Sequence, residues 1–259
     1  MRAFGMMALA GYTYAASTPY ISGQITSTSE YQYGRFVGKM TCPDQAGSTI
    51  GFFTQYNMPV WNIGNWESIE MEVVPSLDPT PLSLDLSYGD GVSRIQEQNF
   101  DETFEPFEDA HIYTFEWTPE YISFAVDGRE LKRYESEDPG VKGNVHPQVI
   151  MFNMWAPRWD AHDEDWSAGR DDSTMPWYAK LDYVEYWSYD QSTGEFNQEW
   201  VDNFDTLDQS KWRVSHEEGF DENLSTYMNT QVKVEDGQVV LTLDKNWSFA
   251  DSWEKAFIE

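Results

Sequence analysis

Short apolar runs and alternating apolar and polar positions follow one another along most of this 259-residue chain, with almost no sustained helical period. Strands produce this pattern because their successive side chains point to opposite faces of a sheet. The clearest strands are expected at residues 31–40, 50–55, 66–74, 82–88, 111–117, 121–126, 149–155, 179–187 and 239–243. Many short strands at this spacing predict an all-β sandwich or jelly roll.

Turn signals divide these segments. The dipeptides Asp127-Gly128 and Asp236-Gly237 each lie between two strand-like stretches, and Asp-Gly readily supplies the positive φ that tight hairpins need. The acidic stretch 160–172 and the run 190–199 are the best candidates for loops or linkers. The residues after Glu199 contain too few strands to form a sandwich alone, so we expect them to pack into the first part of the chain.

One predicted strand, residues 65–74, combines an apolar face with an acidic one. Ser68, Glu70 and Glu72 share one face, while residues 69, 71 and 73 are apolar and share the other. Two carboxylates held on one strand face repel each other, which raises the pKa of at least one of them and makes a general acid available. The alternative is a solvated strand edge whose acidic face has no chemical role.

Composition limits the classes of partner. The chain carries 45 acidic and 16 basic residues, a formal charge of −29, so nucleic acid and anionic membrane surfaces would be repelled. A neutral polymer or a cation is tolerated. The acidic residues are spread along the chain, which favours a role in solubility. No stretch approaches the roughly 18 apolar residues of a membrane span, and the single cysteine, Cys42, is expected to be a buried small hydrophobe.

Aromatic residues make up 16% of the chain and include 12 Trp, several of them beside Asn, Asp or Gly. Stacking on sugar rings would explain this surplus, and packing inside a β-sandwich is the alternative. At the N-terminus, Arg2 precedes a short apolar run and small residues, which resembles a signal peptide loosely. The sequence therefore predicts an N-terminal segment, 1–19, followed by a single domain, 20–259. A signal remnant, an expression scar and an ordinary N-terminal segment are the alternatives for 1–19.

Several motifs resemble glycoside hydrolase family 16, and within it the mixed-linkage β-glucanases (lichenases). The strand at 68–72 occupies the frame of that family's catalytic Glu-x-Asp-x-Glu, and further matches lie at 33–36, 115–119, 126–128 and 152–155. The resemblance implies a concanavalin-like β-jelly roll. Residues 200–205 with Trp212 look like the family's first strand, yet they follow 181–186, which look like its last. This order implies a circular permutant, with 200–259 corresponding to the family's usual N-terminal strands; a truncated second domain would leave incomplete sheets.

The resemblance assigns chemistry to this strand. It implies retaining endo-hydrolysis of a β-glucan, first of mixed linkage and second a laminarin or marine galactan, with Glu72 as acid/base. The nucleophile position is Ser68, and Glu70 replaces the helper Asp. Hydrolysis is therefore expected to be very slow or absent. Three explanations are open: an engineered substitution that traps substrate or favours synthesis, a natural non-catalytic β-glucan binder, or a shifted register in which Glu67 acts.

The resemblance also implies further sites. Substrate-binding positions are Phe53, Gln55, Asn57, Trp66, Asp85, Asn153, Trp155, Trp159, Phe220 and Asn223, with Trp166 as a looser candidate. A structural Ca²⁺ would be bound by the Asp182 side chain and by carbonyls of Asn203 and Gly237. Four widely spaced histidines disfavour a transition-metal site. The expected protein is a secreted or extracytoplasmic monomer whose partner is a β-glucan.

Overall fold

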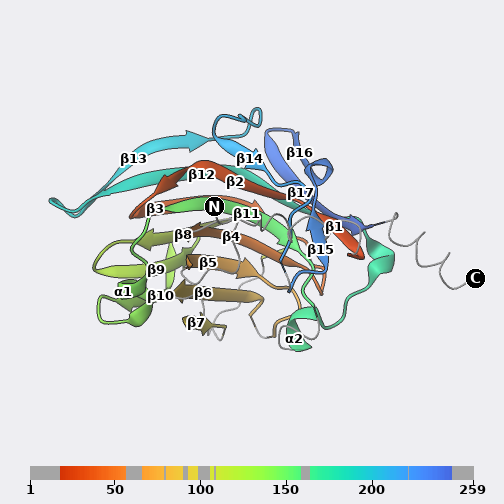
Figure 1. Ribbon diagram of the computed structural model, residues 1–259, viewed down its shortest axis with the longest axis horizontal. Coiled ribbons are helices and arrows are strands. Elements are labelled where there is room, and N and C mark those ends of the chain that lie inside the picture. Colours follow the sequence, from red (N-terminus) through yellow and green to blue (C-terminus); the bar gives the residue numbers. More distant parts are fainter. Residues whose placement is uncertain are drawn as a thin grey trace, which may run out of the picture.

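The computed structural model describes residues 18–56, 66–78, 80–89, 93–98, 106, 107, 109–158, 164–220 and 222–246. Within these ranges the strands form two sheets, and Figure 1 shows the short helices at the periphery of the sheets. The fold is thus almost entirely β, as the alternation of apolar and polar residues predicted.

The larger sheet has ten strands. Its main path runs in the order β10 (Arg129–Glu135), β9 (Tyr121–Val126), β8 (His111–Trp117), β3 (Gly34–Thr41), β12 (Trp177–Asp190), β17 (Gln238–Lys245), β1 (Tyr20–Ser22) and β15 (Ser225–Tyr227). Off this path, β13 (Glu195–Asp202) pairs with β12, and β16 (Val232–Glu235) pairs with β17. Strand β12 pairs antiparallel with both β3 and β17, whereas β1 and β15 pair in parallel.

The smaller sheet has seven strands and carries the predicted catalytic strand near its middle. Its order is β14 (Trp212–Val214), β2 (Gln24–Tyr31), β11 (Gln148–Trp155), β4 (Thr49–Tyr56), β5 (Glu67–Val73), β6 (Leu82–Tyr88) and β7 (Ser93–Glu97). The helices are α1 (Pro139–Gly143), α2 (Glu164–Ser167) and the 3₁₀ turns η1 (Asp172–Thr174) and η2 (Asn229–Gln231). None of the helices in the described ranges is long and apolar enough to cross a membrane.

The core lies between the two sheets and is filled by one face of each strand. On β5 the alternating residues Ile69, Met71 and Val73 are fully buried in it. Phe52 of β4 meets Phe115 of β8 with ring centroids 5.5 Å apart, which joins the two layers. Burial of apolar surface contributes about 25 cal/mol per Å², so this face of β5 is fixed inward. The polar face of β5 consequently points away from the core.

Strands that lie wholly or partly within the last sixty residues complete both sheets. β13 pairs with β12, β14 pairs with β2, and β17 lies between β12 and β1. The expectation that the residues after Glu199 pack into the first part is therefore confirmed. Cys42 is buried, also as expected.

Turns explain where the observed strands agree with the predicted strands and where they differ from them. Asp127-Gly128 and Asp236-Gly237 both have positive φ and join β9 to β10 and β16 to β17, which confirms the two hairpins. The single strand expected at 31–40 is divided, because Tyr33 and Gly34 adopt positive φ between β2 and β3. The loop expected at 190–199 is confirmed only at 191–194, where a tight turn with Gly194 at φ 75° joins β12 to β13. Residues 195–199 instead belong to β13, a strand whose polar residues hid its pattern.

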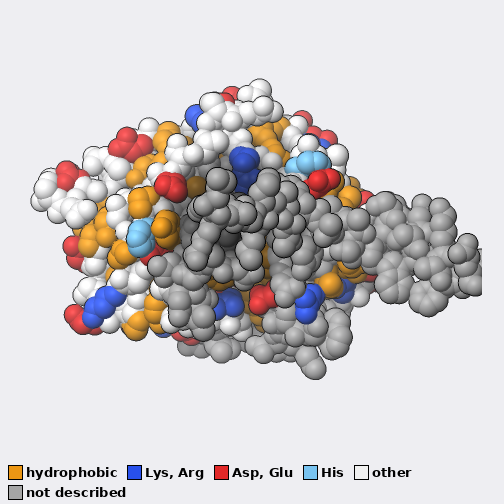
Figure 2. All heavy atoms as spheres, in the orientation of Figure 1, with side chains coloured by type: hydrophobic (Ala, Val, Ile, Leu, Met, Phe, Trp, Pro, Cys, Tyr) orange, Lys and Arg blue, Asp and Glu red, His pale blue; other side chains and the backbone are white. Residues whose placement is uncertain are grey.

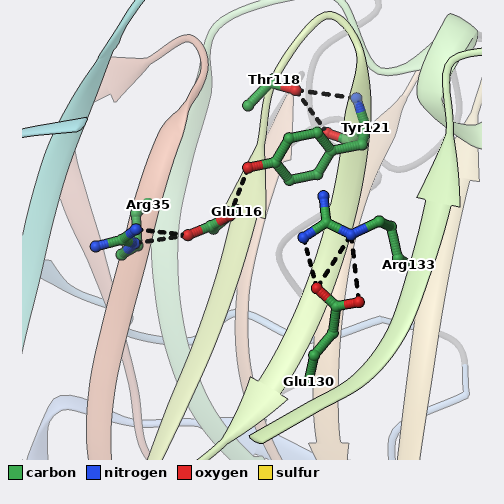
Figure 3. A network of polar contacts seen from close by, with 6 residues as sticks. All are labelled: Arg35, Glu116, Thr118, Tyr121, Glu130 and Arg133. Atoms are coloured by element: carbon green, nitrogen blue, oxygen red, sulfur yellow. Dashed lines mark hydrogen bonds and ion pairs between the residues drawn. The ribbon is translucent and has the colours of Figure 1, made fainter. Parts of the chain in front are cut away.

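The outward face of the larger sheet is covered by paired charges (Figure 3). Arg35 of β3 binds Glu116 of β8 with a nitrogen-to-oxygen distance of 2.7 Å, and Tyr121 donates to the same carboxylate at 2.6 Å. The guanidinium of Arg133, which is bonded to Glu130, lies 3.8 Å from the centroid of the Tyr121 ring. On the face seen in Figure 2, the visible acidic side chains are scattered, which agrees with a role in solubility.

Candidate functional site

The face of the smaller sheet that points away from the core is called here the site face. Strand register places its residues in three rows that cross the sheet. One row holds Gln24, Asn153, Gly51, Glu72 and Ser83; the second holds Thr26, Met151, Phe53, Glu70, Asp85 and Gln96; the third holds Val149, Gln55, Ser68, Ser87 and Arg94. Residues from five or six strands thus share one surface. The sequence prediction placed Phe53, Gln55, Asp85, Asn153 and the three residues of β5 here.

The β5 residues Ser68, Glu70 and Glu72 form the centre of this face. Ser68 and Glu72 are buried, and Glu70 is partly exposed. Ser68 Oγ donates a hydrogen bond to Glu70 Oε1. The serine therefore has a carboxylate beside it, which sequence reasoning did not foresee.

Burial and mutual repulsion raise the pKa values of both glutamates. For Glu70 the main cause is burial, followed by the Asp85 charge, and together they raise its pKa to about 7. For Glu72 burial again comes first, then the charges of Glu70 and Asp85, and its pKa lies well above the ordinary value. Glu72 is therefore protonated over a wider pH range, as a general acid must be. The general acid inferred from two carboxylates on one strand face has the environment that it needs.

The buried Asp85 forms an ion pair with Arg94, whose side chain is 39% exposed, beside the glutamates. Arg94 Nε donates to Asp85 Oδ1 at 2.6 Å, and Ser83 Oγ donates to Oδ2 at 2.8 Å. Asp85 has no exposed surface, so both of its oxygens are held by protein groups. Arg94 was missed at the sequence level. Its only signal was the alternation of Arg94 and Gln96 in a short, charged edge strand.

An aromatic cluster lies at one end of the site face. Trp155 of β11 is 5.0 Å from Phe220 and 6.3 Å from Trp166 between ring centroids. Trp155 also has a hydrogen bond with Glu72, which acts to lower the pKa of that carboxyl. Tyr227 of β15, also missed by sequence reasoning, packs in the same cluster. Three of the predicted aromatic positions are thus brought together next to the acid.

Asn153 lies across the sheet from Glu72, with Gly51 between them. Its Nδ2 donates to Gln24 Oε1 at 3.2 Å and to the Tyr227 hydroxyl at 3.0 Å. Its Oδ1 is buried and has no hydrogen-bond partner within the described part of the chain. A Cβ at Gly51 would lie 2.8 Å from that oxygen, so a side chain there would cover it. The amide oxygen is an acceptor that a ligand hydroxyl could use.

Glu67 lies on the opposite face of β5 from Glu72. β5 pairs with β4 from Glu67 to Val73 without a shift in register. The Glu67 carboxylate is buried and accepts hydrogen bonds from the backbone N–H groups of Val145 and His146. It is also 2.6 Å from the His146 ring. A shifted register with Glu67 as catalyst is therefore wrong, because this carboxylate holds a loop.

Other predicted substrate positions have different outcomes. Trp66 forms a β-bridge directly before β5. Since it is two residues from Ser68 along the strand, its side chain points to the same side, the site face. Asn223 instead caps a turn, because its Oδ1 accepts from the N–H and hydroxyl of Ser225 at 2.7 and 2.6 Å. Asn57 and Trp159 lie outside the described residues.

The positions expected to bind calcium fit a divalent cation poorly. Gly237 does lie beside the Asn203 carbonyl, as the expected backbone ligands require. The Asp182 carboxylate, however, forms an ion pair with Lys39 at 2.7 Å and accepts a hydrogen bond from Gln238. No group of three or more His, Cys, Asp or Glu side chains gathers as a metal site in the described ranges. Calcium binding stays a prediction that this donor set does not favour, since an ammonium already neutralises the carboxylate.

Comparison with known proteins agrees with this architecture. The chain is 26% identical over 239 residues to a β-glucanase of Fibrobacter succinogenes, covering 90% of this chain and 66% of that protein. It is 33% identical over 174 residues to a β-glucanase of Acetivibrio thermocellus, covering 67% of this chain and 48% of that protein. The chain therefore spans between about half and two thirds of the length of these curated relatives.

A solved structure and a family model extend the comparison. A β-1,3-1,4-glucanase (lichenase) derived from a mouse hindgut metagenome superposes with a TM-score of 0.50 at 27% identity, over 64% of this chain and 79% of that chain. The family model described as glycosyl hydrolases family 16 matches residues 7–184, which is more than half of the chain. The chain thus belongs to glycosyl hydrolase family 16.

Proposed function

We propose that this chain is an endo-acting, retaining β-glucanase whose hydrolysis is slowed because residue 68 is a serine. The observation that carries the proposal is the Glu72 carboxyl, which is buried on the site face and has a pKa well above its ordinary value. A neutral carboxylic acid beside Trp155 and Phe220 can protonate the oxygen of a departing sugar. Relatives that are β-glucanases support the substrate class.

Ligand recognition would use the aromatic cluster and the amides of the site face. Aromatic rings give affinity for the faces of sugar rings, and the Asn153 amide and Gln55 select orientation through hydrogen bonds. Mixed-linkage β-glucan is the first candidate substrate, and a laminarin or marine galactan is the second. Because such polymers do not cross membranes, we propose that the protein works outside the cytoplasm, as a monomer.

The order of strands in the family is part of the proposal. The match to the Fibrobacter β-glucanase runs over 239 residues, whereas the family model ends at residue 184. Residues 200–259 supply β14, β15 and β17, which complete both sheets. These observations support a circular permutation in which 200–259 correspond to the family's usual N-terminal strands.

A second candidate function is a natural β-glucan-binding protein without catalysis. Ser68 favours it, since a carboxylate is absent at the expected nucleophile position. Product analysis separates the two candidates: the chain is incubated at high enzyme concentration with mixed-linkage glucan, laminarin and a galactan, and the oligosaccharides are separated. Internal cleavage with the β-anomer formed first supports the retaining enzyme. Binding without any product supports the binder, and neither binding nor products would contradict both.

A further inference from the structure

The side chains of Ser68 and Glu70 are joined by a hydrogen bond on β5. Ser68 Oγ donates to Glu70 Oε1, and the two residues are successive on the site face. The bond holds the Glu70 carboxylate toward position 68. Glu70 is also one methylene longer than the aspartate expected there, so its carboxylate reaches further along the strand.

Among the described carboxylates at the centre of the site face, Glu70 is the most accessible. Asp85 has no exposed surface and is held by Arg94 and Ser83, and Glu72 is 6% exposed. Glu70 is partly exposed. A substrate on this face would therefore meet the Glu70 carboxylate and the Glu72 carboxyl, with Asp85 beside Glu70 on the neighbouring strand β6.

We propose that Glu70 is the nucleophile of this chain, attacking the anomeric carbon of a bound β-glucan while Glu72 protonates the departing oxygen. The assignment rests on the proposed function. Residues two apart on a strand have Cα atoms about 6.6 Å apart, and the bond to Ser68 tilts Glu70 away from Glu72. This arrangement leaves room for an anomeric carbon between two carboxyl groups, which retaining enzymes place about 5–5.5 Å apart.

The two steps balance with these residues and water alone. In the first, a carboxylate oxygen of Glu70 forms a bond to the anomeric carbon, the bond from that carbon to the departing chain breaks, and Glu72 gives its proton to the departing oxygen. In the second, a water oxygen bonds to the anomeric carbon, Glu72 takes the water proton, and the ester bond to Glu70 breaks with its electron pair returning to the carboxylate. Two inversions give net retention.

Ser68 is the competing nucleophile, with Glu70 as its base. A sugar transferred to a serine hydroxyl forms an acetal as stable as the glycosidic bond of the substrate, and its cleavage needs a proton donor at the serine oxygen. The ester formed with a carboxylate breaks more readily, because a carboxylate is a good leaving group. Exposure also favours Glu70, because it is partly exposed whereas Glu72 is buried. Burial raises the pKa values of both glutamates, and Asp85, Arg94 and Glu222 are the other charged groups that act on Glu70.

Covalent trapping tests the assignment. The probe is a β-cellotrioside with a dinitrophenyl leaving group and with fluorine in place of the hydroxyl next to the anomeric carbon, which slows breakdown of the glycosyl-enzyme. Wild type, Ser68→Ala, Glu70→Gln and the exposed control Glu135→Gln are incubated with the probe, and the peptides are mapped by mass spectrometry. We expect an adduct on Glu70 in wild type, Ser68→Ala and the control, and none in Glu70→Gln. Turnover of mixed-linkage glucan should fall at least a hundredfold in Glu70→Gln and stay within twofold of wild type in the control.

Calorimetry with an unmodified oligosaccharide distinguishes failure of the Glu70 assignment from failure of the proposed function. If wild type binds the sugar but the adduct lies on another residue, or none forms, the assignment of Glu70 is overturned and the proposed binding of β-glucan stands. If wild type binds no β-glucan, the proposed function fails and the assignment fails with it. Thermal unfolding of each variant shows that the loss of adduct in Glu70→Gln is not a loss of fold.

Discussion

Carboxylates in the two outward faces of this sandwich have opposite surroundings. On the larger sheet, Glu116 is paired with Arg35 and Glu130 with Arg133. On the site face, three carboxylates, Glu70, Glu72 and Asp85, share one guanidinium, that of Arg94, among the residues that the structure describes. The first arrangement balances charge for each acid, whereas the second leaves an excess of acid in a buried place.

This difference separates a structural role from a chemical one. A paired surface carboxylate contributes at most about 1 kcal/mol to stability. A buried, under-compensated carboxylate costs stability when charged, and it is retained where a proton must be held near neutral pH. The comparison assigns chemistry to the site face and solubility and modest stabilisation to the outer network of Figure 3.

Restoring a carboxylate at position 68 should have the largest effect. Ser68→Glu is expected to raise hydrolysis of mixed-linkage glucan by roughly a thousandfold, about 4 kcal/mol of transition-state stabilisation. The physical reason is that retaining chemistry then has a nucleophile in the family's frame with Glu72 already placed. Reducing ends released from barley-type glucan measure the change, and Ser68→Ala is the control. No detectable hydrolysis by any of the three proteins would contradict the account and favour the non-catalytic binder.

Removing the general acid should have the next largest effect. In the Ser68→Glu background, Glu72→Gln is expected to lower hydrolysis of natural glucan by about a hundredfold or more. A dinitrophenyl glycoside needs no protonation, so its glycosyl-enzyme should still form, and added azide should speed turnover. Stopped-flow release of dinitrophenolate measures this step. Equal losses on both substrates without azide rescue would remove Glu72 from the role of acid.

Neutralising Glu70 should change stability in a pH-dependent way. Its pKa is raised to about 7 from 4.5, so its contribution to folding is present below about pH 4.5 and is lost as pH rises through 7. Glu70→Gln is therefore expected to be more stable than wild type at pH 8, on the order of 2 kcal/mol after allowance for partial exposure, and similar at pH 4.5. The charged groups acting on Glu70 are Glu72, Asp85, Arg94 and Glu222. Urea unfolding at both pH values measures the difference, and a loss of stability at pH 8 would be the contrary result.

The outer network supplies the smallest expected effect. Glu116→Gln removes one charge from the pair with Arg35, whose side chain is 34% exposed. We expect a loss of stability of about 1 kcal/mol or less and no change in glucan hydrolysis or binding. Urea unfolding and the reducing-end assay measure the two quantities. A tenfold loss of activity here would contradict the division between the two faces.

The sequence predicted the fold better than it predicted the neighbours of the catalytic strand. Alternation placed β6, β8 and β9 at their observed bounds, and the Asp-Gly pairs placed two hairpins. Strands β1 and β15 were missed because each has three residues, too few to show a period. Arg94 and Tyr227 were missed for another reason: cross-strand register and the position of distant strands are set by tertiary packing, not by local sequence.

Binding of an oligosaccharide to the site face tests the central claim most directly. Isothermal calorimetry with mixed-linkage, laminarin and cellulose oligomers should give one preferred neutral ligand, whose affinity barely changes with salt because it carries no charge. Thermal unfolding first shows whether Trp155→Ala is folded. The folded variant should bind that ligand more than tenfold more weakly, a loss of about 1.4 kcal/mol of binding free energy. Failure of all three glucans to bind, together with salt-sensitive binding of a polycation, would contradict the claim that this face recognises a β-glucan.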